Sequence, residues 1–159
     1  MTQPATDASV RTSITVQVPP ERAWSVFCER MGAWWSRDYS IGRAELADAV
    51  VEPRAGGRWY EVGADGSECD WGRVIAWEPP ARLVLAWQIG VDWSHDPDPG
   101  RASEVEVRFV PEGAGATRVE LEHRRLERHG EGWEGLKGGV EADEGWPLYL
   151  DRYAALLGG

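Results

Sequence analysis

The sequence predicts an α+β domain in which helices cover one face of an antiparallel sheet. Apolar and polar residues alternate strictly over 104–109 and again over 118–123, which is typical of strands with one buried and one solvated face. Near the C-terminus the apolar residues instead recur at spacings of three and four, as on the buried side of a helix, at Trp146, Leu150, Tyr153 and Leu157. Helices segregated to one face of such a sheet define the α+β class.

The N-terminal part is predicted to hold one strand and two short helices. Residues 1–9 are polar and are expected to be a disordered leader, whereas 10–18 alternate as a half-buried strand. Pro20 opens a helix, because proline is tolerated in a first helical turn. Gly32 is expected to break this helix, and a second short helix or turn begins at Ala33.

Six further strands are predicted before the last helix, and turn residues separate them. An Asp-Gly pair at 65–66 indicates a hairpin. The segment 90–102 is expected to be a long exposed loop, and 126–144 a mobile, glycine-rich crossover with room for one short helix. The strands are expected within 44–52, 58–62, 68–77, 82–87, 104–109 and 118–123, and the final helix from Trp146.

Length, charge and cysteine content limit the function. At 159 residues the chain is expected to form one domain, covering 10–159. The net charge of -10 disfavours nucleic acid and anionic membranes as partners. Cys28 and Cys69 cannot build a disulfide framework. With neither an apolar signal segment nor a membrane span in the sequence, a cytoplasmic protein is expected.

The ten tryptophans are the unusual feature of the composition. Each wide indole could simply be core, because buried tryptophan is common where its N–H finds an acceptor. So many stiff rings are difficult to pack densely, however, so the set as a whole favours a lined cavity.

Several motifs resemble one family. Gly56-Gly57-Arg58-Trp59-Tyr60-Glu61, Trp71-Gly72, Pro79-Pro80-Ala81-Arg82-Leu83 and Gly145-Trp146-Pro147 stand in an order of elements that is similar to the START-like (SRPBCC) superfamily. The closest branch is related to the C-terminal domain of the heat-shock-protein ATPase activator. The motifs Gly-Gly-Arg-Trp-Tyr-Glu, Glu122-His123 and Gly-Trp-Pro also resemble the self-resistance proteins that bind enediyne antibiotics such as calicheamicin.

The resemblance implies a helix-grip fold, a curved antiparallel sheet wrapped around a long C-terminal helix, with a hydrophobic cavity between them. Across the superfamily that cavity holds lipids, sterols, polyketides and hormones. The expected function is therefore non-enzymatic binding of a bulky aromatic or polyketide-like molecule, in antibiotic self-resistance or sequestration. A chaperone partner is not expected, because the activator's separate N-terminal domain is not in this sequence. The predicted ligand-binding residues are Trp35, Trp59, Trp71, Trp87, Phe109, His123, Trp146, Tyr149 and Tyr153.

Two other functions stay open. His123 is predicted to point inward and could act as the general base of a cyclase or hydratase, with Arg58 and Glu61 orienting the substrate, or could be an ordinary pocket-wall histidine. A chaperone-activating interaction module is the third possibility, and it requires a large exposed apolar patch.

The remaining titratable groups predict no further site. His95 stands among three aspartates in the 90–102 loop, and a solvated acidic loop is favoured over a cation site. His129 is expected to be exposed, and neither a metal-ligand set nor a cofactor motif is found. Arg58, Glu61, Asp70 and Arg73 form cross-strand ion pairs or line a cavity mouth, depending on which way their strands face, and the sequence leaves that parity open.

Overall fold

The computed structural model describes residues 9–35, 44–143 and 145–157. In these ranges one strand, two short helices, six strands and two further helices follow one another, so the predicted order is confirmed. The strands are β1 (Val10–Val16), β2 (Leu46–Val51), β3 (Arg58–Gly63), β4 (Glu68–Glu78), β5 (Arg82–Trp87), β6 (Ser103–Pro111) and β7 (Thr117–Arg124). The helices are α1 (Pro20–Glu29), α2 (Met31–Trp34), α3 (Trp133–Glu141) and α4 (Trp146–Leu156), with 3-10 turns η1 (Pro99–Arg101) and η2 (Leu126–His129).

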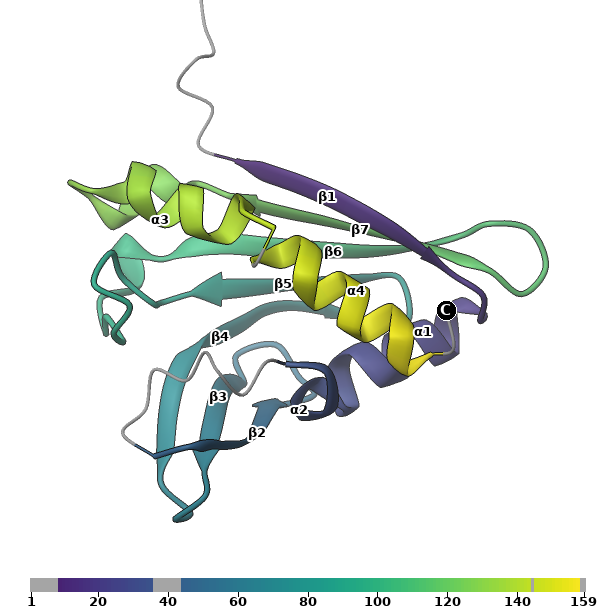
Figure 1. The fold of residues 1–159 in the computed structure, drawn as a ribbon, viewed down its shortest axis with the longest axis horizontal. Coiled ribbons are helices and arrows are strands. Elements are labelled where there is room, and N and C mark those ends of the chain that lie inside the picture. The colour runs from purple at the N-terminus through teal and green to yellow at the C-terminus, as the bar shows by residue number, and fades with distance from the viewer. Residues whose placement is uncertain (1–8, 36–43, 144, 158–159) are drawn as a thin grey trace, which may run out of the picture.

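The strands form one antiparallel sheet in the order β1-β7-β6-β5-β4-β3-β2. Its register places inward residues opposite one another, as in the pairs Val105 with His123 and Val107 with Leu121. The sheet curves, and α4 lies across its inner face with α1 and α2 beside its C-terminal end (Figure 1). Buried side chains from all seven strands belong to one hydrophobic core, which also includes Trp146, Tyr149 and Tyr153 of α4.

The break between α1 and α2 differs from the prediction. α1 ends at Glu29, and Gly32 lies inside α2. A Cβ atom at Gly32 would stand 1.8 Å from Asp48 Oδ1 and 2.9 Å from the backbone nitrogen of Ala49. The glycine is therefore required for close approach of α2 to β2, not for ending a helix.

The last helix is fixed to the N-terminal helices by polar contacts. Tyr153 donates its hydroxyl to the carbonyl of Ala23 at 2.7 Å. Arg152 donates from Nε to the carbonyl of Trp34 at 2.9 Å and from Nη2 to that of Trp35 at 3.5 Å. These bonds hold α2, and the ring that follows it, against α4.

A β-bulge between β3 and β4 resolves the parity of their side chains. Trp59 pairs with Gly72 and Tyr60 with Asp70, so Trp71 is the extra residue. Both Trp59 and Trp71 are buried on the inner face, whereas Arg73 lies opposite Arg58 and is half exposed. Simple alternation would place Trp71 and Arg73 on the same face, but the bulge adds one residue and turns them to opposite faces.

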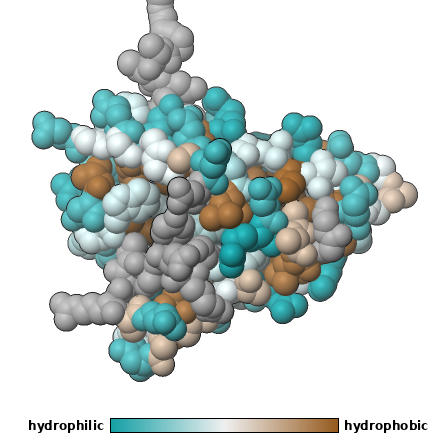
Figure 2. All heavy atoms as spheres, in the orientation of Figure 1, coloured by the Kyte–Doolittle hydropathy of each residue, from teal (hydrophilic) through white to brown (hydrophobic). Residues whose placement is uncertain are grey.

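The exposed apolar side chains among the described residues come from several elements. Figure 2 shows separate apolar patches between polar ones on the face that carries α4. The large apolar residues that are exposed among the described residues come from β4, the loop after β5, β6 and α4, namely Ile75, Val91, Trp93, Val110 and Leu156. None of the described helices is long and apolar enough to span a membrane.

Candidate functional site

The inner face of the sheet and α4 enclose a layer of aromatic rings around Trp35. Its indole stacks on Tyr149, with centroids 4.2 Å apart and planes 15° apart, and leans over Trp71 at 4.7 Å. The edges of Trp59 and Trp146 face it at 6.4 and 5.9 Å. Trp35 thus occupies a flat slot bounded by four rings from β3, β4 and α4. Its Nε1 is buried and meets no acceptor among the described residues.

The nine predicted residues are all buried, with exposed fractions of at most 6 %, but they form two groups. Trp87 joins the first group by contacts with Trp59 at 5.7 Å and with His123 at 4.9 Å. Phe109 and Tyr153 instead pack on Phe27, at 5.6 and 5.3 Å. The second group lies under α1, so the structure does not bring these two residues to the slot.

A chain of hydrogen bonds leads from α4 through three buried polar side chains. Trp146 Nε1 donates to His123 Nδ1 at 3.1 Å. Ser103 Oγ lies 2.7 Å from His123 Nε2 and 2.7 Å from His129 Nε2. The expectation that His129 is exposed is wrong: the η2 turn folds it under β6, and its exposed fraction is 8 %.

The indole N–H of Trp146 fixes the donor and acceptor roles along this chain. An indole N–H can only donate, so His123 Nδ1 must be the acceptor and neutral His123 carries its proton on Nε2. That proton is donated to Ser103, whose hydroxyl is then free to donate to His129 Nε2. The remaining ring nitrogen, His129 Nδ1, is buried and finds no partner among the described residues.

Burial favours the neutral form of both imidazoles. Desolvation, helped by the nearby His129, lowers the pKa of His123 to about 3. Desolvation also lowers the pKa of His129, but the carboxylate of Asp96 opposes the shift by favouring the cation. His123 is consequently a neutral donor and acceptor in the folded protein, and a positive charge is more easily held at His129.

A second polar group lies at the other end of the aromatic layer. Glu61 is 1 % exposed and accepts a hydrogen bond from Trp71 Nε1 at 2.8 Å. Trp71 also leans on Trp35, so the buried carboxylate stands behind the slot. The alternation of its strand puts Glu61 on the same face as Trp59, and of the four charged residues that the sequence grouped together it is the one that turns inward.

The other charged residues of that group lie on the outer face. Arg58 donates to Asp70 Oδ1 from Nη2 at 2.6 Å and to Glu68 at 2.9 Å, and Arg73 reaches Asp70 at 3.4 Å. Arg58 therefore cannot orient a molecule held inside the sheet. The cross-strand ion-pair interpretation is the one that the structure supports.

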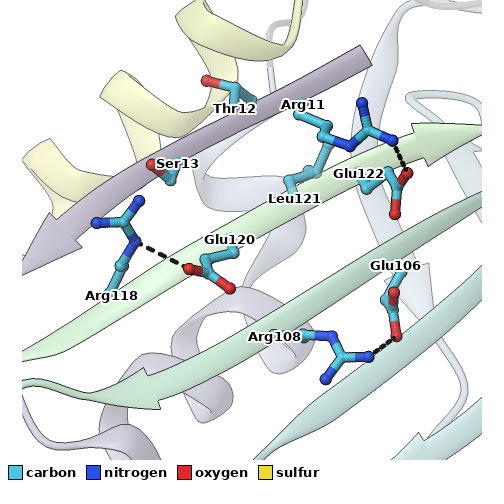
Figure 3. A pocket seen from close by; sticks show the side chains of 9 residues that line it. All are labelled: Arg11, Thr12, Ser13, Glu106, Arg108, Arg118, Glu120, Leu121 and Glu122. Carbon is cyan, nitrogen blue, oxygen red and sulfur yellow. Dashed lines mark hydrogen bonds and ion pairs between the residues drawn. The ribbon is translucent and has the colours of Figure 1, made fainter. Parts of the chain in front are cut away.

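A shallow pocket of about 370 Å³ also lies on the outer face, over β1, β7 and β6. Its charged side chains pair with one another, as Arg11 does with Glu122 at 3.0 Å and Arg118 with Glu120 at 2.9 Å (Figure 3). None of the nine predicted residues lines it. Its mutually neutralised surface does not select an aromatic ligand.

The loop after β5 and the cysteines add no reactive group. In that loop Asp92 accepts from Ser94, and Asp96 pairs with Arg101 at 2.8 Å. No cluster of three His, Cys, Asp or Glu suited to a metal is found among the described residues. Burial raises the pKa of the Cys28 and Cys69 thiols, which makes them poor nucleophiles.

A curved antiparallel sheet that grips a C-terminal helix over an aromatic interior is the START-like, helix-grip fold. Residues 17–158 match the family described as Activator of Hsp90 ATPase homolog 1-like protein, and the chain belongs to that family. A comparison with curated protein sequences finds no match.

Among solved structures, one similar chain is the anthrahydroquino-γ-pyrone synthase Txn09, which is 40 % identical and matches over 97 % of this chain and 99 % of its own, with a TM-score of 0.67. The self-sacrificing resistance protein CalC from Micromonospora echinospora is 29 % identical over 95 % of this chain and 94 % of its own, with a TM-score of 0.68. DynU16, from the dynemicin biosynthetic locus, is 24 % identical over 96 % of this chain and 48 % of its own, with a TM-score of 0.60, and supports the fold alone.

Proposed function

We propose that this protein binds a flat, polycyclic aromatic polyketide between the inner face of the sheet and α4. The observation that carries the proposal is the slot around Trp35, whose indole stacks on Tyr149 and is tilted against Trp71. Four rings arranged in this way suit any planar aromatic molecule of similar thickness. The 40 % identity to a synthase named for a fused aromatic product supports the same class of ligand.

Binding requires the ligand to take the place of the Trp35 ring. A tryptophan buries about 150–250 Å², which at about 25 cal/mol per Å² corresponds to roughly 4–6 kcal/mol lost when it is expelled. A three-ring ligand offers more apolar area than one indole, so its burial can offset this cost. The other residues proposed to contact the ligand are Trp59, Trp87, His123 and Trp146, whereas Phe109 and Tyr153 support the slot from the second group.

The test is a titration of tryptophan fluorescence with 1,8-dihydroxyanthraquinone. Trp35→Ala empties the slot and is expected to bind this probe more tightly than the wild type. The matched control is Trp77→Ala, which removes an indole that packs on Trp24, outside the slot. A flat titration curve in the wild type, or equal affinity in all three proteins, would count against the proposal.

A cyclase activity is the second candidate, and the buried histidine chain favours it. His123 Nδ1 is an acceptor pointing at the slot wall, so it could take a proton from a phenol that displaces the Trp146 N–H. The resulting phenolate would attack a side-chain ketone, and ring closure to a pyrone would release one water. An ortho-hydroxyaryl 1,3-diketone tests this by mass spectrometry: His123→Gln is expected to abolish loss of water while the fluorescence change persists.

Self-resistance is the version that the likeness to CalC supports. It predicts that an activated enediyne cuts the backbone of this protein next to the slot. Intact mass after exposure to the activated drug, with no fragment, would remove this version while leaving the binding proposal standing.

A further inference from the structure

Ser103 and His129, which the proposed function does not use, extend the polar chain from His123 toward the edge of the domain. Ser103 begins β6 and is fully buried, and His129 ends the η2 turn. Beyond them, Asp96 in the loop after β5 lies close enough to His129 for each to influence the pKa of the other. The polar side chains from His123 to Asp96 therefore lead from the aromatic interior to a surface loop.

We infer that Ser103 and His129 form a proton relay, which carries the proton of a phenolic ligand away from His123. The inference rests on the proposed function, because the ligand must reach His123. Its direction follows from Trp146: since the indole can only donate, the proton of neutral His123 must sit on the side of Ser103. The relay is thus already oriented for transfer outward.

Each step conserves atoms and charge. The phenolic O–H of the ligand replaces the Trp146 N–H at His123 Nδ1 and transfers its proton there. His123 releases its Nε2 proton to Ser103 Oγ, and the hydroxyl proton of Ser103 passes to His129 Nε2. The ligand becomes a phenolate, His123 stays neutral in its other tautomer, and the positive charge rests on His129.

His129 is the better place for that charge. His123 is surrounded by the rings of Trp87 and Trp146, which cannot stabilise a cation as a carboxylate does. His129 has Asp96 nearby, and Asp96 is itself held by Arg101 at 2.8 Å. Two titratable groups of neighbouring elements interact electrostatically with His129 among the described residues: His123, whose pKa it lowers, and Asp96, which raises the pKa of His129. The buried His129 Nδ1, unpaired among the described residues, is the point from which the proton can leave.

The tautomers of the free protein give the first test. Long-range proton–nitrogen NMR of protein labelled with ¹⁵N at histidine is expected to show His123 protonated at Nε2 and His129 at Nδ1. Finding the proton of His129 on Nε2 would leave Ser103 without an acceptor and overturn the relay. This measurement needs no ligand and no substitution.

The second test follows the ionisation of bound 1,8-dihydroxyanthraquinone, whose visible absorption changes when a phenol loses its proton. Ser103→Ala breaks the chain, and His129→Gln accepts the serine hydroxyl without being able to take up a proton. In both variants the apparent pKa of the bound phenol is expected to rise by at least about one unit, a tenfold loss in ionisation. The matched control, His95→Gln, changes a histidine whose backbone forms an isolated β-bridge with Ile89. The phenol bound to this variant is expected to ionise as it does in the wild type.

Binding and ionisation are read separately. Fluorescence quenching in the wild type reports the proposed function, and its absence refutes that function. Quenching in all four proteins with the same absorption titration refutes the relay alone. If His129→Gln does not fold, Ser103→Ala carries the same comparison.

Discussion

Acid destabilisation through His123 is the prediction that the structure defines most sharply. This imidazole is fully buried, and its pKa is lowered from 6.5 to about 3. Below about pH 6.5 the unfolded chain binds a proton there, while the folded chain does not until about pH 3. The free energy of unfolding must therefore fall as the pH falls through this window.

The size of the effect follows from linkage. One proton bound only by the unfolded chain changes the free energy of unfolding by about 1.4 kcal/mol per pH unit. Between about pH 6.5 and pH 5 His123 is thus expected to cost roughly 2 kcal/mol. Burial lowers the pKa of His129 as well, which adds to the loss with the same sign. Carboxyl groups with lowered pKa, such as Glu106 with an ordinary value of 4.5, act mainly below this window.

Urea unfolding of the wild type and of His123→Asn at several pH values measures the effect. The asparagine side chain retains an acceptor for Trp146 but cannot be protonated. The variant is expected to be less stable at neutral pH, and its deficit should shrink by roughly 2 kcal/mol toward pH 5. The control Trp77→Ala removes no titratable group, so its free energy of unfolding should differ from that of the wild type by the same amount at every pH. A deficit in His123→Asn that stays constant with pH would refute the reasoning.

Other predictions concern packing. Gly72→Ala is expected to lower the free energy of unfolding by several kcal/mol, because a Cβ there would stand 1.7 Å from a carbonyl oxygen of β5. Gly135→Ala in α3 meets nothing within 4 Å and should stabilise the fold by up to about 1 kcal/mol. Thermal unfolding measures both variants, and equal effects would contradict these contacts. Tyr153→Phe should lose about 1 kcal/mol with its 2.7 Å hydrogen bond, read from urea unfolding. A double-mutant cycle with Glu61→Gln and Trp71→Phe should show coupling of at least about 0.5 kcal/mol, and additivity would argue against their hydrogen bond.

The fold could be predicted because its signals are local and repeat. Alternation in 104–109 and 118–123 and the helical spacing after Trp146 each depend on neighbours within a few residues. The errors arose at two places. At Trp71 a bulge shifts the alternation of inward and outward residues in β4, and at Gly32 a glycine allows α2 to approach β2 closely. Neither effect has a local signature, because both depend on the strand or helix that comes alongside.

The site could be predicted only in part, for the same reason. Inward side chains such as Phe109 and His123 follow from the strict alternation of their strands, whereas the parity of the strand that carries Trp59 stayed open. The division into two groups and the burial of Glu61 do not follow in this way, since they depend on which helix lies over which strand. His129 looked exposed because its neighbours are charged and glycine-rich, and its partner Ser103 lies 26 positions earlier in the chain. The spacing of Leu126 and His129, both buried in one turn, was the signal that could have found it.

Keeping two histidines and a serine inside an aromatic interior works against stability. Each buried polar group loses its hydration and needs a partner in return, and His129 Nδ1 has none among the described residues. A leucine in place of His123 would escape the acid instability described above. Folding stability does not explain this arrangement, whereas the proposed function gives it a role. Burial makes His123 a poor resting place for a proton, and in the proposed relay the same burial favours passing that proton on, so acid instability and the proposed relay would share one physical cause.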